Sequence, residues 1–424
     1  MTKHTHFSLS LDTLLLLLLT PALLWFNPVS NALAVVLLAL YVVLGWIYPQ
    51  LPDELAVPQR ANRIAYLARI AIIFFVIMLA TLLPTAWFIM LRHADGPETH
   101  ATDGLIQTET AIQFLLDGKN PYTENYFGTP LEKFPGREPP LTMSPLYHFA
   151  YLPFLVIGSI PFYLSSYLWL GWYDQRFPYL LLYGIMLLAL PALASPQRNK
   201  LSLLIAVGLN FLFGDYLAEG RNDIVVLCGL VITTALVARG WIAASALVLG
   251  LMLATKHSAF FFLPFYLCYL LPAPITTASL RKLVWRLLPL AIAVAVLILP
   301  FLFWDAASFY DDTVTYITGS GPNAFPIKGW GFGALMLFLQ VIPTPDSAFP
   351  FGLFELVFGL PTLFFLLRYQ RRENTLSQMW LGFAIFSFVV EFFSRFFADN
   401  YVIFILQALV IAVFIAPTRR EEEA

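Results

Sequence analysis

Long runs of apolar residues, separated by short polar turns, make up most of this chain. A bilayer-spanning helix needs roughly 17 to 25 mostly apolar residues, and somewhat fewer in a tightly packed bundle. The pattern therefore predicts an all-α, polytopic transmembrane helical bundle of about fourteen spans. The predicted spans lie near residues 10–27, 30–48, 63–91, 144–160, 161–173, 177–194, 201–215, 223–238, 240–255, 258–272, 283–303, 349–368, 376–394 and 397–416.

Two apolar runs need a separate interpretation. The first, within residues 1–27, has no small-residue cleavage site after it, so we expect a retained helix rather than a signal peptide. The run 331–342 is too short to span a bilayer and would reverse the orientation of the turn that follows it. We therefore expect a re-entrant or surface-lying helix there.

No internal repeat or low-complexity tract divides the chain, so we treat it as a single integral membrane domain. Within this domain we distinguish an N-terminal helical hairpin (1–62), a core (63–272) and a set of C-terminal helices (273–424). The core contains a long polar loop at 92–143, and the C-terminal part contains a second polar loop at 304–348.

Lysine and arginine in the short turns predict the orientation, because such turns remain cytoplasmic. The turns in question carry Arg60, Arg63, Arg198, Lys200, Arg239, Arg281, Lys282, Arg286, Arg368, Arg371, Arg372, Arg419 and Arg420. If all of them are cytoplasmic, both termini are cytoplasmic in a cell (plasma or inner) membrane. The polar regions 92–143, 215–223, 304–328 and 391–400, together with Lys256 and His257, then lie on the extracytoplasmic side.

The composition supports a lipid environment and excludes one class of partner. Hydrophobic residues make up 59% of the 424 residues and charged residues only 12%, against roughly 25% charged residues in soluble domains. The net charge is −2, so the chain lacks the basic surface that a nucleic-acid partner requires. Cys228 and Cys268 lie inside apolar runs, where we expect buried apolar side chains rather than a disulfide or metal ligands.

The loop 92–143 is the longest polar stretch between two apolar runs. Leu105, Ile112, Leu115 and Leu116 gather on one face of a helix over 105–116, which predicts an amphipathic helix on the membrane surface. Asp103 precedes that helix, and Gly118 to Tyr122 end it with a glycine and a proline turn.

This order of features resembles a known group of membrane enzymes. An aspartate after an early helix, a surface helix, the Gly118–Tyr122 turn and the prolines Pro139, Pro140 and Pro145 are similar to those of GT-C fold glycosyltransferases. Within that group the chain is most similar to glycosyltransferase family 87, the polyprenyl-phosphate-mannose-dependent enzymes, and the stretch 250–265 resembles the family's later helical hairpin. The chain departs from the family pattern at Asp103-Gly104-Leu105, which has no tyrosine, and this leaves the sugar and the acceptor open.

The resemblance implies a hexosyltransferase whose loop aspartate removes a proton from the acceptor hydroxyl. A positioned carboxylate is a suitable base, and a phosphate leaving group needs cations rather than a second carboxylic acid. We predict that Asp103 is this base, with Asp95 as its rival. The alternative is that Asp103 only caps the following helix.

The predicted substrate-binding residues follow that base in the chain, and we expect them at the same face of the bundle. They are Glu109, Asn120, Tyr122, Arg221, Asn222, Lys256 and His257. Lys256 is the candidate for the donor phosphate, because an ammonium in an apolar hairpin is costly unless it is paired; snorkelling to the headgroups is the alternative. Arg221 is a second cation for that site or an ion-paired helix cap, and Glu109 faces substrate hydroxyls or solvent.

No cofactor is required by this chemistry. The histidines lack the spacing of a zinc site, so no residue is predicted as a metal ligand, but a loosely held divalent cation (Mg²⁺ or Mn²⁺) near Asp95 and Asp103 stays an alternative.

The expected function is transfer of mannose, or another hexose or pentose, from a polyprenyl-phosphate-linked donor in the bilayer. The acceptor would be a glycan, a lipid or a protein on the extracytoplasmic face. A transporter or flippase of a lipid-linked or small polar substrate is the alternative, for which charges inside apolar spans would be the sign. A non-catalytic membrane scaffold is a third.

Overall fold

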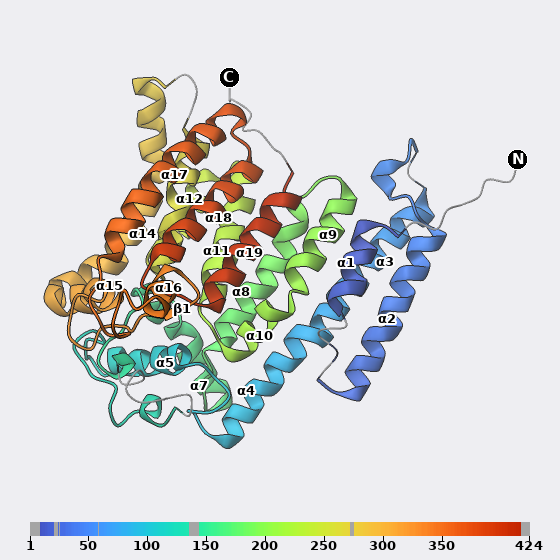
Figure 1. Ribbon diagram of the computed structural model, residues 1–424. Coiled ribbons are helices and arrows are strands. Elements are labelled where there is room, and N and C mark those ends of the chain that lie inside the picture. Colours follow the sequence, from blue (N-terminus) through green and yellow to red (C-terminus); the bar gives the residue numbers. More distant parts are fainter. Residues whose placement is uncertain are drawn as a thin grey trace, which may run out of the picture.

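The computed structural model describes residues 9–20, 24, 26–57, 59–134, 144–271 and 275–416, and it is almost entirely helical. Figure 1 shows the helices as a bundle with loops and short helices gathered at one end. The helices of the N-terminal part and of the first loop are α1 (Leu11–Leu19), α2 (Pro28–Ile47), α3 (Arg60–Ile77), α4 (Leu83–Asp95) and α5 (Asp103–Leu116). A π-helical turn, Met78–Leu82, joins α3 to α4.

The remaining elements complete the bundle and its second loop. The central helices are α6 (Phe154–Ile157), α7 (Ile160–Leu170), α8 (Arg176–Ala189), α9 (Gln197–Gly208), α10 (Phe211–Glu219), α11 (Asp223–Ala238), α12 (Ile242–Leu253) and α13 (Leu263–Leu270). The C-terminal helices are α14 (Thr277–Tyr310), α15 (Tyr316–Thr318), α16 (Phe332–Phe338), α17 (Phe351–Glu373), α18 (Leu376–Phe393) and α19 (Asp399–Phe414). Two short strands, β1 (Lys328–Gly329) and β2 (Phe396–Phe397), pair in parallel.

Five helical segments among the described residues are long and apolar enough to cross a membrane, or six if one bent pair counts as a span. They are Pro28–Glu54, Arg60–Asp95, Thr277–Thr318, Phe351–Glu373 and Leu376–Phe393, with the pair Gln197–Gly208 and Phe211–Glu219. The chain is therefore a helical membrane protein, but the predicted number of spans is not confirmed. Several predicted spans, among them 223–238 and 240–255, are helices of only 10–17 residues.

Proline and asparagine explain where apolar runs fail to form straight spans. The prediction of a span at 144–160 is wrong, because this stretch holds only the 3₁₀ turn Ser144–Leu146 and the four-residue helix α6; Pro145 and Pro153 interrupt helical hydrogen bonding there. The run 201–215 is bent by 46° between α9 and α10. The Asn210 side chain accepts a hydrogen bond from Phe213 N at 3.3 Å and so starts a new helix at the bend.

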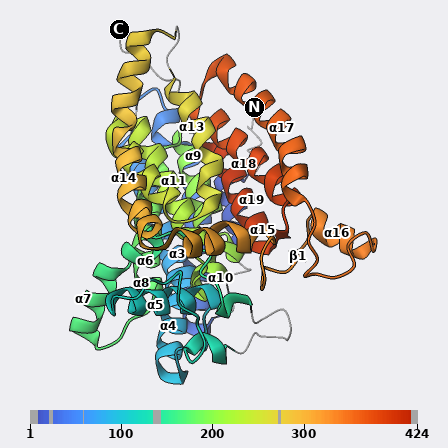
Figure 2. The ribbon, with the colours of Figure 1, turned by 90° about the vertical axis from the view of Figure 1, so that its left-hand side faces the viewer.

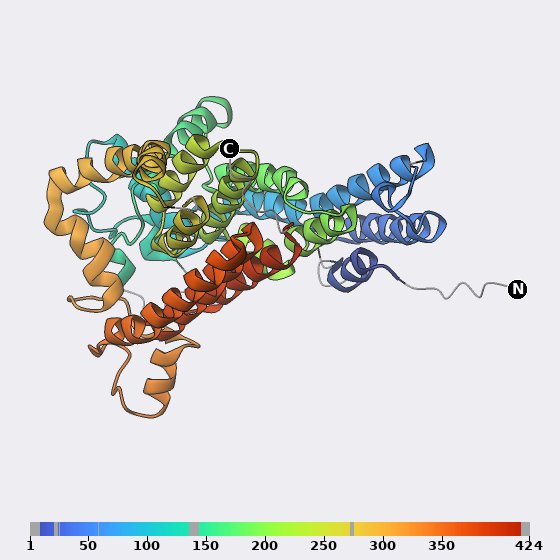
Figure 3. The ribbon, with the colours of Figure 1, turned by 90° about the horizontal axis from the view of Figure 1, so that it is seen from above.

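Helix α11 forms the centre of the bundle. Thirteen of its positions are buried, from Asp223 to Val237, and it packs against α8, α12 and α19. A helix that is apolar all round belongs inside other helices. Figure 3 shows the N-terminal helices, in blue, lying to one side of this bundle.

A buried carboxylate connects the N-terminal helices to the core. Asp12 on α1 is fully buried and accepts hydrogen bonds from Tyr41 Oη at 2.6 Å and from Arg198 Nη1 at 3.3 Å. Arg69 Nη1 lies 4.0 Å from the same carboxylate. Because Arg198 belongs to α9, the contact explains why α1 lies against that helix.

The turns gather at two opposite ends of the bundle. At one end Gln197 N donates to Asp53 Oδ2, Arg371 Nη1 to Leu271 O and Ala416 N to Leu193 O. This end carries the basic turns named above, apart from Arg419 and Arg420, which lie outside the described residues.

The other end is called the polar rim below and consists of residues 95–134, 144–153, 219–223, 254–257 and 394–400. Thr102 N donates to Glu219 O at 2.9 Å, Leu152 N to Thr255 O at 3.1 Å and Trp330 N to Phe397 O at 2.7 Å. Figure 2 shows α5 and α7 below the bundle at this end. Helix α16, at seven residues, is too short to span and lies in the loop beside the rim.

The separation of the two ends predicts opposite accessibility in a membrane. Lys119 is exposed at the polar rim and Ala278 is exposed at the basic end. The native Cys228 and Cys268 are buried. We expect Lys119→Cys and Ala278→Cys to react with a membrane-impermeant maleimide from opposite sides of sealed vesicles, because one bilayer separates them. Labelling of both from the same side would contradict this arrangement.

Candidate functional site

Asp103 is the first residue of α5 and its side chain is exposed at the polar rim. Thr102, rather than Asp103, is the N-cap: Thr102 Oγ1 accepts from Leu105 N at 3.4 Å. Among the described residues, Gly104 N is the one donor to the Asp103 carboxylate, at 2.7 Å from Oδ1. The carboxylate therefore keeps most of its acceptor capacity for a ligand.

Tyr151 connects Asp103 to the bundle. A Cβ added to Gly104 would lie 2.3 Å from the Tyr151 hydroxyl, so this close approach requires glycine. Burial, followed by the charge of Asp103, raises the pKa of Tyr151 above its ordinary value, whereas the neighbouring Asn222 side chain lowers it. Tyr151 thus lies between the predicted base and Asn222.

Lys256 is paired with the start of α11. Its Nζ donates to Asp223 Oδ1 at 2.6 Å and to Asn222 Oδ1 at 3.0 Å, and it lies 5.3 Å from the centre of the Tyr401 ring. Asn400 Nδ2 donates to the other oxygen of Asp223 at 2.9 Å. The side chain of Lys256 is only 13% exposed, so ion pairing describes it better than snorkelling.

Arg221 forms an ion-paired cap. Its Nε donates to Glu219 Oε2 at 2.7 Å and its Nη1 to Asp399 Oδ1 at 3.3 Å, and its guanidinium lies 4.1 Å from the centre of the Tyr216 ring. Burial opposes the charge of Arg221, but the hydrogen bond and charge of Glu219 outweigh it and raise the pKa of the guanidinium. Arg221 and Lys256 therefore belong to neighbouring but separate ion pairs.

The other predicted residues range from exposed Asp95 to buried Asn120 and Tyr122. Asp95, the rival base, is hydrogen-bonded to His100 Nε2 at 2.7 Å. Asn120 and Tyr122 are buried, and Tyr122 Oη donates to Tyr151 O at 2.8 Å. The turn 118–122 therefore holds the backbone of Tyr151 in place. His257 begins the 3₁₀ helix His257–Phe262 beside Lys256 and is partly exposed. Pro139 and Pro140 lie outside the described residues.

Glu109 belongs to a largely buried ion-pair network on another side of α5, where its side chain is 13% exposed. Its two oxygens accept from Arg92 Nη1 and Nη2 at 2.8 and 2.7 Å, and Oε1 also accepts from Gln175 N. Arg92 donates in addition to Asp174 at 3.0 Å, and Asp174 accepts from Arg176 at 2.8 and 2.7 Å. Glu109 is thus not on a solvated face. Burial raises the pKa of Asp174, but hydrogen bonds and the charge of Arg176 outweigh it, so that pKa is below its ordinary value.

Among the described residues, His148, Asp311 and Asp312 form a group that could hold a metal ion. The Nδ1 atom of His148 lies 2.8 Å from Asp312 Oδ1 and 3.7 Å from Asp311 Oδ2, and the ligand atoms of the three residues lie within 4.8 Å of one another. The second oxygen of Asp312 accepts from Phe149 N at 2.8 Å. Through His148 Nδ1 and Phe149 N, Asp312 attaches the segment 144–149 to the π-helical turn Asp311–Thr315 that follows α14. The divalent cation stays a prediction.

The sequence analysis did not find several residues that shape the rim. Tyr151 and His148 stood inside a run interpreted as a span, although the prolines on either side are a signal against it. Asp174 and Arg176 stand together between two apolar runs, and paired charges at such a position are a recognisable sign of a buried ion pair. Asn400 carries no sequence signal that would connect it with Asp223.

Comparison with known proteins identifies no relative: no family model, curated protein or solved structure matches the chain.

Replacing Lys256 tests the buried ion pair. Removal of one partner from such a pair costs about 3–5 kcal/mol, so Lys256→Met should lower the thermal unfolding midpoint in detergent by several degrees. Lys256→Met combined with Asp223→Asn should regain part of that loss, whereas Lys133→Met, at an exposed lysine, should change nothing. Equal midpoints for wild type and Lys256→Met would show that the pair does not stabilise the fold.

His148 predicts a pH dependence. Burial opposes its protonation, but the hydrogen bond and charge of Asp312 outweigh burial and raise its pKa. A raised folded-state pKa gives stability that is complete below the ordinary value of about 6.5 and is lost as the pH rises through the raised value. Thermal midpoints should therefore fall above about pH 6.5, and His148→Gln should remove this decline. An identical decline in His148→Gln would assign it to another group.

Proposed function

We propose that this protein is a membrane glycosyltransferase that uses a lipid-phosphate-linked sugar. The observation that carries the proposal is the exposed carboxylate of Asp103, which shares the polar rim with the cations of Lys256 and Arg221 at the end of an apolar bundle. A base for a hydroxyl and donors for a phosphate, placed where lipid meets water, match the requirements of this transfer.

The reaction would balance as a direct displacement. Asp103 takes the proton of the acceptor hydroxyl while that oxygen forms a bond to the anomeric carbon of the sugar. The bond between the anomeric carbon and the phosphate oxygen breaks, and its electron pair leaves with the lipid phosphate. A carboxylate within hydrogen-bonding reach suits the first role, and charge-assisted N–H donors suit the last.

Lys256 and Arg221 each keep N–H groups that could donate hydrogen bonds to that phosphate, although each cation is already paired with a carboxylate. Lys256 uses two of its three N–H groups on Asn222 and Asp223. Arg221 uses Nε and Nη1, and its side chain is 27% exposed. The carboxylates hold both cations in place, so a phosphate would meet positioned donors rather than flexible side chains.

The orientation completes the proposal. With the basic turns on the cytoplasmic side, the polar rim faces the opposite side, in a cell membrane with both termini in the cytoplasm. The acceptor would then be a glycan, lipid or protein outside the cytoplasm, and the donor would reach the rim from the outer leaflet. Mannose, or another hexose or pentose, is the sugar that the resemblance favours, and Mg²⁺ or Mn²⁺ would be an auxiliary group rather than a requirement.

Asp103→Asn tests this function. The purified protein in nanodiscs is given radiolabelled polyprenyl-phosphate sugars and a panel of acceptors. Loss of a general base lowers rates by about 10²–10⁴, so the variant should lose at least about 100-fold in transfer while its thermal midpoint stays unchanged. Asp117→Asn, at the exposed far end of α5, is the matched control and should remain active.

Other outcomes of the same assay are equally informative. Full transfer by Asp103→Asn would remove this residue from the mechanism. Movement of the labelled donor across sealed vesicles without a glycoside product would favour the transporter.

A further inference from the structure

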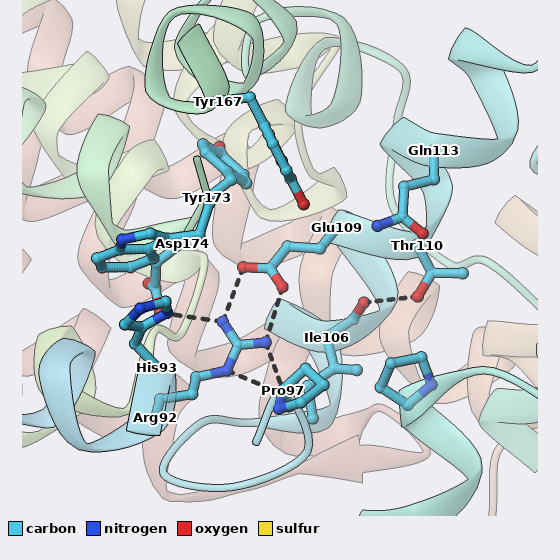
Figure 4. Close-up of a pocket in the computed structure, with 12 residues that line it drawn as sticks. Arg92, His93, Pro97, Ile106, Glu109, Thr110, Gln113, Tyr167, Tyr173 and Asp174 are labelled. Atoms are coloured by element: carbon cyan, nitrogen blue, oxygen red, sulfur yellow. Dashed lines mark hydrogen bonds and ion pairs between the residues drawn. The ribbon is translucent and has the colours of Figure 1, made fainter. Parts of the chain in front are cut away.

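A cavity of about 200 Å³ opens beside α5, on the side of the helix that carries Glu109. Arg92, Ile106, Glu109, Thr110 and Gln113 contribute to its wall. Figure 4 shows Glu109 between Arg92 and Tyr167 in this cavity. Drug-sized ligands occupy roughly 300–1,000 Å³, so this cavity is suited to a smaller molecule.

The ion-pair network beside the cavity carries balanced charges: Arg92, Glu109 and Asp174 line the cavity, and Arg176 lies behind Asp174. The network contains two cations, Arg92 and Arg176, and two carboxylates, Glu109 and Asp174, at ion-pair distances of 2.7 to 3.0 Å. Such a balanced set gives no net attraction to an anion or to a cation. A neutral ligand therefore fits this wall better than a phosphate, a carboxylate or an amine.

The remaining wall is aromatic. Trp172 stacks on His93 with ring centres 4.1 Å apart and an interplanar angle of 17°, and Tyr167 and Tyr173 also line the cavity. Aromatic faces bind the flat apolar faces of small rings, and few polar groups then fix the orientation. A sugar ring presents such C–H faces together with hydroxyl groups at its edge.

Two side chains with unused hydrogen-bond acceptor sites, Glu109 and Thr110, line the cavity together with those rings. Glu109 Oε2 accepts one hydrogen bond from protein, so a carboxylate oxygen with two lone pairs keeps one site. Thr110 Oγ1 donates to Ile106 O at 3.0 Å and keeps acceptor capacity. Because Arg92 and Gln175 hold Glu109 rigidly, the site would be preorganised for hydroxyl donors.

The cavity lies on the same helix as Asp103. Thr110 follows Asp103 by seven residues, which places it about 10 Å further along the helix axis at 1.5 Å per residue. A single ring in the cavity could not reach the carboxylate, but a chain of linked sugars could reach both.

We propose that this cavity binds one ring of a neutral oligosaccharide, and that this oligosaccharide is the acceptor whose terminal hydroxyl meets Asp103. The first half of the inference depends only on the cavity; the second half rests on the proposed transferase function. It assigns Trp172 and Tyr167 as binding residues of the acceptor chain.

The test measures binding without catalysis. The full-length protein in nanodiscs is examined by saturation-transfer NMR with neutral methyl hexosides, namely those of mannose, glucose and galactose, and with methyl glucuronide as a charged comparison. We expect at least one neutral hexoside to bind, and methyl glucuronide to bind more weakly. Trp172→Ala should raise the dissociation constant about tenfold.

Controls separate the cavity from the fold and from the chemistry. Tyr167→Ala removes a side chain that is 44% exposed and should also weaken binding without unfolding the protein. Trp169→Ala, 82% exposed and outside the cavity, should leave binding unchanged. Asp103→Asn should still bind the hexoside while it loses transfer.

Two results would overturn the inference. Absence of binding by every neutral hexoside, or unchanged binding in both Trp172→Ala and Tyr167→Ala, would remove the sugar site even if transfer by the wild type is observed. Binding that depends on Trp172 in a protein without transferase activity would keep the site and reject only its role as an acceptor site.

Discussion

The contact of Lys256 with Asp223 is the interaction on which the polar rim depends. It joins the start of α11 to the segment after α12, and Asn400 extends it to the start of α19. Asn222, which accepts a hydrogen bond from Lys256, is also a neighbour of Tyr151, the residue beside Asp103. An unpaired ammonium or carboxylate at this depth would destabilise the fold. The charges proposed to bind the phosphate are therefore also those that hold the segments of the rim together.

The two sides of α5 carry different chemistry because a helix distributes neighbouring residues around its axis. Asp103 and Gln107 lie toward the segment 144–151, where Gln107 Nε2 donates to Pro145 O and His148 O. Glu109 lies toward Arg92 and the aromatic cavity. A short helix that was expected on the membrane surface is instead packed on several sides, and it carries both the proposed base and a wall of the proposed binding cavity.

The sequence predicted the class of the fold and the placement of the charges better than it predicted the individual spans. Apolar runs and basic turns indicated a helical bundle with two chemically different ends, and α5 appeared with nearly the expected bounds. The span count is not confirmed, because hydropathy does not distinguish a lipid-facing helix from a short one buried as α11 is. The pairings of Asn400 with Asp223 and of Asp174 with Arg92 join segments far apart in the chain, and no local pattern specifies such partners.

The buried carboxylate of Asp12 has a consequence for biosynthesis. Its partner Arg198 follows 186 positions later in the chain, which corresponds to roughly 10–40 s of translation at 5–20 residues per second. During that interval α1 has already been synthesised, but α9 has not. The first helix must therefore rely on Tyr41 and Arg69, or wait unassembled at the insertion machinery, until the second arginine emerges.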